Sequence, residues 1–280
     1  GAAPPPRDGD DKDAALLRAW TAALRSRRMD TRRHSTGEAA ILAGELAIGT
    51  PYKPNTLEEY IVAGGDPGGR EPLIIGLMEF DCVTLVESCL AVARSAKAGG
   101  KPSWDLFGHE VERMRYRDGK RGSYASRLHY FSEWISDGER RGLVRNVGRE
   151  LGGVVDSRPL RFMTEHRSSY RALADDGVFR RIGEMERRLD DRPRFVIPAD
   201  AISAVADRIE SGDVLAFATE IPGLDVSHSA YAYRGPDGVL RVLHAPLSGG
   251  VVEITRSTLP EYVAKIRRSA GILVARPLNP

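Results

Sequence analysis

The sequence predicts an α+β fold in which a helical part precedes an antiparallel sheet. Apolar residues recur at helical spacing through most of the first two thirds of the chain. The last third instead alternates apolar and polar residues between turns that contain glycine and proline. The 280 residues are ample for a sizeable core, and no internal repeat is evident. We therefore expect a helical lobe, a sheet lobe and a functional site in the groove between them.

Local patterns place the expected elements along the chain. Helical spacing and capping residues predict helices at 14–28, 35–47, 82–98, 124–140 and 259–269 and a short helix or turn at 56–63, whereas the pattern over 103–116 is mixed. Apolar or alternating runs predict strands at 195–198, 213–218, 225–233, 239–245, 251–254 and 271–275, with a brief extended run at 73–76.

The same patterns suggest how the chain is organised. Residues 1–13 are polar and rich in proline, and we expect them to form a flexible lead-in. Residues 14–280 are expected to form a single domain. Within it, 103–191 is expected to be a mostly helical insertion that walls the groove.

Cys82 stands where a helix is expected to begin. Asp81 is a suitable N-cap, and Thr84 can complete a capping box with it. A cysteine in the first turn meets unpaired N–H groups and the positive end of the helix dipole, which lower a cysteine pKa to roughly 3.5–7.5. The position therefore favours a reactive nucleophile; the alternative is a small buried hydrophobic residue.

The other cysteine cannot pair with Cys82 in this helix. Cys89 lies seven residues further on, a rise of about 10.5 Å, whereas the Cα atoms of a disulfide lie within about 7 Å. We expect two free thiols, with Cys89 packed in the core. Neither CxxC nor a four-ligand zinc spacing is present, so we expect no metal and no cofactor.

Two histidines come together if the expected hairpin forms. His228 lies on one strand, with Val226 expected on the same face, and His244 lies on the next. A turn centred on residue 236 or 237 places His244 opposite His228 or one step diagonal to it; opposed Cβ atoms are about 4.5–5.5 Å apart. One imidazole can then serve a thiol while the other orients it, as in a catalytic triad. A metal site is the weaker alternative, because no third ligand shares the spacing.

Several stretches resemble the papain-like NlpC-type cysteine hydrolases and, more closely, their N-acetylmuramoyl-L-alanine amidase-like branch. The resemblance is carried by 49–52 (Gly-Thr-Pro-Tyr), 80–87 (Phe-Asp-Cys-Val-Thr-Leu-Val-Glu), 123–135, 212–217, 223–228 and 243–245. It spans 36–277 and implies a papain-like fold over 14–280. The helical lobe would carry the cysteine helix, and the antiparallel lobe would carry the histidines. One departure is Pro246, where the family pattern leads us to expect serine.

The resemblance also implies roles for particular residues. Cys82 would be the nucleophile, His228 the general base and later acid, and His244 the group that holds the His228 ring. The thiolate would attack an amide carbonyl, an amine would leave, and water would hydrolyse the thioester. The backbone N–H of Cys82 would stabilise the oxyanion. Tyr52 and Asp81 resemble residues that recognise the peptide near the scissile bond. The alternative for Tyr52 is an aromatic residue that anchors the turn after Pro51, and Asp81 can combine peptide recognition with the role of N-cap.

Three further residues are candidate substrate contacts. Arg127 could grip a carboxylate or pair with a nearby acid. If it grips substrate, alanine at this position should raise KM and leave folding intact. Tyr130 could line a sugar or peptide pocket or pack into the helical core. Ser227 precedes His228 in the stretch 223–228.

Composition limits the partners and the location. The net charge of +2 gives no reason to expect a nucleic-acid partner. No apolar run approaches the ~18 residues that a membrane-spanning helix requires. The start Gly1–Pro6 resembles a mature terminus after removal of a signal peptide, so we expect a periplasmic or secreted protein.

We thus expect a cell-wall hydrolase whose substrate is peptidoglycan or a muropeptide. The amide between N-acetylmuramic acid and L-alanine is the bond that the resemblance favours. Cleavage between D-glutamate and the diamino acid of the stem peptide is the alternative within the same class. Alternatives of other classes are an acyltransferase on the same scaffold and a non-catalytic cell-wall binding module. The sequence does not predict the oligomeric state.

Overall fold

The structure is a computed structural model, and it describes residues 11–280. Its α-helices are α1 (Asp11–Ser26), α2 (Thr36–Ala47), α3 (Glu59–Val62), α4 (Cys82–Ala98), α5 (Trp104–Arg115), α6 (Phe131–Arg140), α7 (Phe162–Glu165), α8 (Asp176–Arg188), α9 (Ile202–Val205) and α10 (Leu259–Ala264). Its strands are β1 (Val144–Asn146), β2 (Val154–Asp156), β3 (Arg194–Pro198), β4 (Val214–Thr219), β5 (Val226–Arg234), β6 (Leu240–His244), β7 (Glu253–Ile254) and β8 (Ser269–Pro277).

The eight strands form one sheet in the order β2–β3–β8–β4–β5–β6–β7, and β1 also pairs with β8. Every pair of these strands is antiparallel. All residues of β4 are buried, because β4 lies between β8 and β5 and both of its faces are covered. The predicted α+β architecture with an antiparallel sheet is therefore confirmed.

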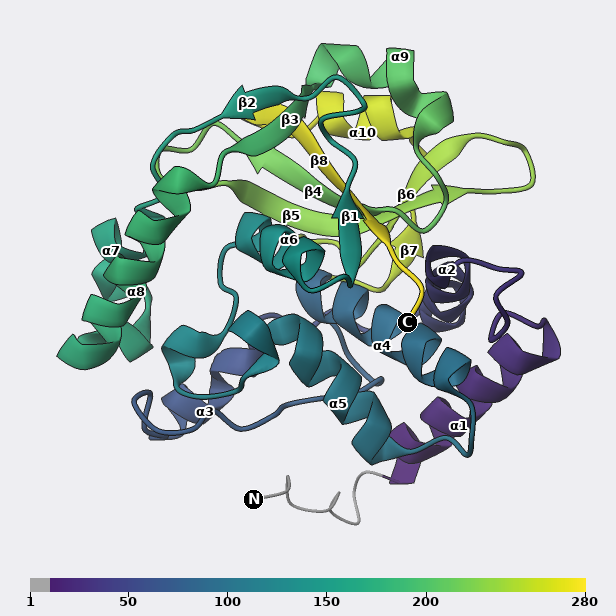
Figure 1. The fold of residues 1–280 in the computed structure, drawn as a ribbon, viewed down its shortest axis with the longest axis horizontal. Helices are drawn as coiled ribbons and strands as arrows, with labels where there is room; N and C mark the ends of the chain where they lie inside the picture. The colour runs from purple at the N-terminus through teal and green to yellow at the C-terminus, as the bar shows by residue number, and fades with distance from the viewer. Residues whose placement is uncertain (1–10) are drawn as a thin grey trace.

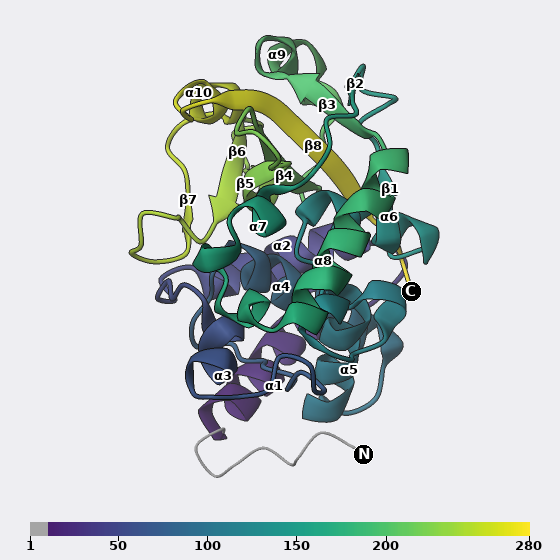
Figure 2. The same cartoon turned by 90° about the vertical axis from the view of Figure 1, so that its left-hand side faces the viewer.

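Helices cover both faces of the sheet (Figures 1 and 2). On one face the largest core joins α1, α2, α4, α5 and α6 to inward side chains of β4, β5 and β8. On the other face a second core packs α9 and α10 against the opposite side chains of the same strands. A third cluster joins α3, α7 and α8 away from the sheet. These layers bury the strands that carry the histidines.

Helix α4 is the centre of the helical layer. It packs against α1, α2, α5 and strand β5, and its residues from Thr84 to Ala96 are all buried. Tyr231 of β5 donates a hydrogen bond to the Val86 carbonyl at 2.5 Å. Because β5 holds α4 in this way, the start of the helix has a defined position against the strand that carries His228.

The expected helix 14–28 begins earlier than predicted. Residues 11–13, assigned to the flexible lead-in, form the first turn of α1. The Leu77 N–H donates a hydrogen bond to the Asp13 carboxylate at 2.7 Å. In the following turns of the helix, the side chains of Leu17 and Trp20 are buried. This tertiary anchor orders residues that look like a linker in sequence; the rest of that lead-in, 1–10, lies outside the described residues.

Three other expected boundaries differ from the structure. The mixed stretch 103–116 contains the helix α5, with Phe107, Val111 and Met114 buried along one face. The helix expected from 124 begins only at Phe131, because Arg127 forms a β-bridge with Tyr116 and extends the backbone there. The last helix stops at Ala264 instead of continuing to 269.

The segment 103–191 contributes to two parts of the molecule. Its helices α5 and α6 pack in the largest core beside α4, and its strands β1 and β2 pair with β8 and β3. Helices α7 and α8 belong to the third cluster and flank the sheet in Figure 1. Much of the segment is thus part of the main core, although the sequence suggested an added wall.

Strand β5 contains an irregularity that changes the expected faces. Phe217 pairs with His228 but Ala218 pairs with Val226, so Ser227 is an extra residue in the strand. Such a bulge interrupts the alternation of side chains. Val226 consequently packs with the largest core, whereas it was predicted to share a face with His228.

The hydropathy of the helices bears on the membrane expectation. Within residues 11–280, no helix combines the length and the apolar character needed to span a bilayer.

Candidate functional site

Cys82 is the first residue of α4, as predicted, and its helix start is capped. Asp81 Oδ1 accepts hydrogen bonds from the N–H groups of Val83 at 3.0 Å and Thr84 at 2.8 Å. The Asp81 N–H donates in return to Thr84 Oγ1 at 2.9 Å. This is the predicted capping box. It rigidly presents the Cys82 side chain at the end of a buried helix.

The surroundings of the thiol do not produce the low pKa expected from its place on the helix. Burial, followed by the negative charge of Asp81, raises the pKa of Cys82 to about 11. Three groups lower the pKa of Cys82 but do not outweigh burial: the N–H groups of Ser229 and Val83 and the Ser229 hydroxyl. The Ser229 hydroxyl lies near the thiol but meets the geometric criteria of a hydrogen bond with no residue within 11–280. The prediction that the helix start lowers the pKa of Cys82 is therefore wrong. Cys82 is a neutral thiol at neutral pH.

Alkylation of Cys82 should accordingly be slow at neutral pH. We expect the rate with iodoacetamide to rise about tenfold per pH unit between roughly pH 6 and 9, because only the thiolate reacts and its fraction grows in that proportion below the pKa. Mass spectrometry of the modified protein measures the rate. A rate that is already constant from pH 6 upward would contradict a raised pKa.

Two variants serve as controls for this measurement. Asp81→Asn retains a good N-cap but removes the charge that raises the pKa of Cys82, so Cys82 should react faster at each of these pH values. An unchanged rate would remove Asp81 as a cause. Cys82→Ala leaves only Cys89, which is fully buried and free as predicted, and should not be modified while the protein is folded.

The two predicted histidines lie side by side. Pairing of β5 with β6 aligns Tyr231 with Leu243, so the turn centres on residue 237 and His244 is diagonal to His228. His228 Nε2 lies 2.8 Å from His244 Nδ1, and the two ring planes meet at 71°. Both rings are buried: 2% of the surface of His228 and 3% of the surface of His244 are exposed. The predicted approach of the two imidazoles is confirmed.

Both rings are held in the neutral form. Burial, with the nearby His244 as the second cause, lowers the pKa of His228 to about 3. Burial also lowers the pKa of His244, although Glu253 opposes this change. His228 stacks on Phe217 with ring centroids 5.5 Å apart. His228 is thus a neutral, oriented imidazole, which is the state a general base requires.

Strand β5 contributes to the surroundings of both the thiol and the histidine pair. The Ser229 N–H, which acts on the thiol, belongs to the residue that follows His228. Tyr262 of α10 contacts the His244 ring, with ring centroids 5.4 Å apart. Burial, followed by the charge of Cys82, raises the pKa of the Tyr262 hydroxyl. His228 Nδ1 is buried and has no hydrogen-bond partner within 11–280. No hydrogen bond joins Cys82 Sγ to that nitrogen in this structure.

Tyr52 lies beside the thiol. Its backbone forms a bridge with Phe80, and its N–H donates to Gly250 O at 2.8 Å. Burial, followed by the charges of Cys82 and Asp81, raises the pKa of the Tyr52 hydroxyl. The structure therefore brings Tyr52, Asp81 and Cys82 together. Ser227 is half-buried at the bulge next to His228.

Arg127 is instead engaged in an internal ion-pair network. Its Nε donates to Glu71 Oε1 and its Nη2 to Glu58 Oε1, both at 2.8 Å. The side chain is only 10% exposed, and Glu71 is 2% exposed. The substrate contact predicted for Arg127 from the sequence is therefore wrong. The structure contains the alternative, in which Arg127 pairs with nearby acids.

Tyr130 likewise faces the interior. Its hydroxyl donates to Glu186 Oε2 at 2.6 Å and accepts from the Met163 N–H at 3.0 Å. The residue is 2% exposed and packs in the third cluster. Core packing, the alternative to a pocket-lining role, accounts for Tyr130.

Sequence reasoning missed Glu253 and Tyr262. Glu253 lies opposite His244 in the pairing of β6 with β7, and its Oε1 is 3.2 Å from His244 Nε2. The strand 251–254 was expected, so extending the pairing by one strand would have found Glu253. No local signal marks Tyr262, because its place depends on how α10 packs over the sheet.

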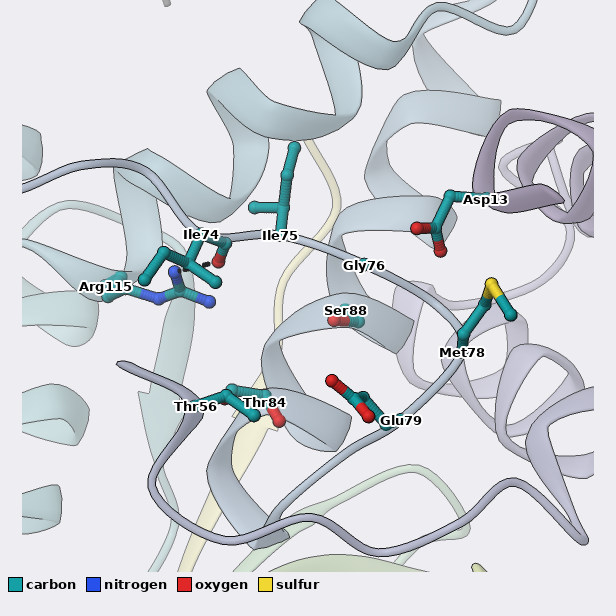
Figure 3. A pocket seen from close by; sticks show the side chains of 10 residues that line it. All are labelled: Asp13, Thr56, Ile74, Ile75, Gly76, Met78, Glu79, Thr84, Ser88 and Arg115. Carbon is teal, nitrogen blue, oxygen red and sulfur yellow. Dashed lines mark hydrogen bonds between the residues drawn. The ribbon is translucent and has the colours of Figure 1, made fainter. Parts of the chain in front are cut away.

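Two pockets adjoin this region on different sides. A pocket of about 280 Å³ lies beside α4 and is lined by Thr84, Ser88, Glu79 and Arg115, among others (Figure 3). None of the candidate catalytic side chains lines it. A second pocket, of about 460 Å³, is formed by the β6–β7 segment and α10 and is lined by His244, Glu253 and Tyr262.

Carboxylates, histidines and cysteines are the side chains that most often bind metal ions in proteins. Within residues 11–280, no three or more of these side chains are grouped so that they could hold a metal ion.

Known structures resemble this chain over most of its length. A crystal structure of an N-acetylmuramoyl-L-alanine amidase from Bacteroides uniformis is 30% identical, covers 86% of this chain and 98% of its own, and superimposes with a TM-score of 0.76. A putative xylanase from Bacteroides fragilis is 32% identical over 83% of this chain and 98% of its own, with a TM-score of 0.74. A Legionella pneumophila protein shares the fold at 19% identity, covers 96% of this chain and 95% of its own, and has a TM-score of 0.68.

Two further comparisons concern curated proteins and protein families. No curated protein matches the chain. The model of the AmiA-like family, described as N-acetylmuramoyl-L-alanine amidase-like, matches residues 43–272. That range includes Cys82, both histidines and Glu253. The chain belongs to the AmiA-like, N-acetylmuramoyl-L-alanine amidase-like family.

Proposed function

We propose that this protein is a peptidoglycan hydrolase that cleaves the amide between N-acetylmuramic acid and L-alanine by cysteine catalysis. The observation that carries the proposal is that strand β5 links the two parts of the site. Ser229 contacts the thiol of the capped helix-start cysteine, and the preceding residue, His228, belongs to the buried, neutral histidine pair. Membership of the amidase-like family supports the substrate. The arrangement of a cysteine helix and a histidine-bearing antiparallel sheet supports a papain-like, NlpC-type catalytic fold.

In this proposal Cys82 attacks as its proton leaves for His228. The raised pKa of Cys82 and the lowered pKa of His228 mean that both groups are neutral before substrate binds. Sγ therefore forms its bond to the carbonyl carbon while Nδ1 of His228 takes the thiol proton. The proposal requires the Cys82 side chain to turn away from Ser229, so that Sγ approaches His228 Nδ1. His228 then gives the proton to the leaving amine, and water hydrolyses the thioester.

The start of α4 offers a donor for the oxyanion. Asp81 occupies the N–H groups of Val83 and Thr84, whereas no residue within 11–280 accepts a hydrogen bond from the Cys82 N–H. That N–H lies at the positive end of the helix, where negative charge is stabilised. Tyr52 and Asp81, which flank the thiol, would contact the peptide next to the scissile bond, and Ser227 would line the same side.

The proposed chemistry differs from glycoside cleavage, which the name of one relative suggests for that relative. Most glycosidases use two carboxyl groups on either side of the scissile bond. The carboxylates next to Cys82 and His244 are already engaged, Asp81 with the helix start and Glu253 with the imidazole. An amide substrate fits a thiol and an imidazole better. Action on the cell wall would place the protein in the periplasm or outside the cell.

Analysis of reaction products tests the proposal. Purified sacculi and soluble muropeptides are treated with wild type or Cys82→Ala, and the soluble products are identified by mass spectrometry. We expect free stem peptides beginning at L-alanine from wild type alone. Glycans that retain a dipeptide would instead identify the endopeptidase bond. Equal product patterns from both proteins would refute cysteine catalysis.

A further inference from the structure

Glu253 completes a hydrogen-bonded series that begins at His228. It lies directly opposite His244 at the edge of the sheet. Glu253 Oε1 is 3.2 Å from His244 Nε2, and His244 Nδ1 is 2.8 Å from His228 Nε2. We propose that Glu253 is a positioning residue that selects the tautomer of both rings and leaves the free lone pair of His228 on Nδ1. This inference rests on the proposed roles of Cys82 and His228.

The order of protons follows from the carboxylate. An ionised carboxylate only accepts hydrogen bonds, so the hydrogen between Glu253 and His244 must belong to His244 Nε2. A neutral imidazole carries one N–H, and His244 Nδ1 is therefore an acceptor. His228 Nε2 must then donate to it. His228 Nδ1 is left without a hydrogen, and this is the buried nitrogen that has no partner within 11–280.

Without the carboxylate the opposite order is equally possible. His244 Nδ1 would then donate to His228 Nε2, and His228 Nδ1 would carry the hydrogen. In that tautomer Nδ1 cannot accept the Cys82 proton, although no atom of the site has moved. The other neighbours of these rings, Phe217 and Tyr262, contact them through their aromatic rings and do not impose either order.

The environment of Glu253 leaves its carboxylate available to His244. Arg256 and Lys265 line the same pocket of about 460 Å³, yet among residues 11–280 the only ion-pair partner of Glu253 within 4.0 Å is His244. When His228 takes the proton from the thiol, its Nε2–H still donates to His244. Glu253 then stabilises the positive charge through His244 without taking a proton itself, and the proton passes on to the leaving amine.

Glu253→Gln tests the inference because it retains the size of the side chain and removes the charge. A glutamine amide can accept or donate, so it no longer imposes one order of protons. We expect kcat to fall by about 10- to 100-fold, the range for losing a hydrogen bond to a charged group, with KM unchanged. Glu220→Gln, at an exposed acid that directly follows β4, is the matched control and should leave kcat unchanged.

A spectroscopic measurement separates this role from a merely structural one. The full chain is labelled with ¹⁵N-histidine, and the signals of His228 are identified by their loss in His228→Gln. In wild type and Glu220→Gln, Nε2 should be the nitrogen that bears hydrogen and Nδ1 the one that does not. In Glu253→Gln the two tautomers should be mixed.

The outcomes distinguish this inference from the proposed function. A mixed tautomer together with a lower kcat supports it. An unchanged tautomer overturns it, and so does a mixed tautomer with an unchanged kcat. Failure of the proposed function appears earlier, as identical products from wild type and Cys82→Ala, before any Glu253 variant is compared.

Discussion

Cys82→Ala is expected to lower kcat on muropeptides by at least about 10⁴-fold, the scale on which hydrolases lose activity without their nucleophile. No other side chain within 11–280 offers a thiol in its place, because Cys89 is fully buried inside α4. The fold should persist, since the helix cap is formed by Asp81 and Thr84 and not by Cys82. Product formation measured by chromatography, with circular dichroism as the folding check, gives the result.

Cys89→Ala is the matched control for loss of a thiol. It creates a small cavity in the largest core and should cost about 1 kcal/mol of stability, while kcat stays within about twofold of wild type. Substantial activity in Cys82→Ala, or loss of activity in Cys89→Ala with a retained fold, would contradict the assignment of the nucleophile to Cys82.

Arg127→Ala is expected to destabilise the fold by about 3–5 kcal/mol, the range for removal of one partner of a buried ion pair. The substitution leaves the Glu71 carboxylate, 2% exposed, without its cation. Among residues 11–280, only the hydroxyls of Tyr60 and Tyr116 remain as its donors. Chemical denaturation measures the change. The KM of the remaining folded protein should be unaffected, which reverses the expectation drawn from the sequence alone.

Arg127→Lys separates charge from geometry at this position. Lysine preserves the charge but cannot reach Glu71 and Glu58 through the two separate nitrogens that arginine uses. Its destabilisation should therefore be smaller than that of alanine. A stable Arg127→Ala protein with a raised KM would show that the residue contacts substrate after all.

Features that depend on neighbouring residues could be predicted from the sequence. The start of α4 follows from Asp81 and Thr84, three residues apart, whose side chains and backbone satisfy one another. The approach of His228 to His244 follows from a short hairpin, in which the turn sets the register. Both interactions join residues close in the chain, so a local pattern contains the information needed.

Features that depend on distant packing could not be predicted in this way. The partners of Arg127 lie 56 and 69 residues away, and the sequence left open whether this residue grips a substrate carboxylate or pairs with an acid of the protein. Tyr130 similarly meets Glu186 across 56 residues. The bulge at Ser227 reversed the expected face of Val226, because the pairing of β5 with β4, and not the alternation of residues, decided it.

The sequence by itself therefore determined the helix that begins at Cys82 and the two strands that carry His228 and His244, because capping, periodicity and hairpin turns act over a few residues. The tertiary structure alone decided the chemical states of these groups. Burial makes the Cys82 thiol and the His228 imidazole neutral, and the packing of α10 over the sheet brings Tyr262 to His244. Desolvation and the packing of a helix over the sheet arise only when distant segments come together, which is why no local pattern contained them.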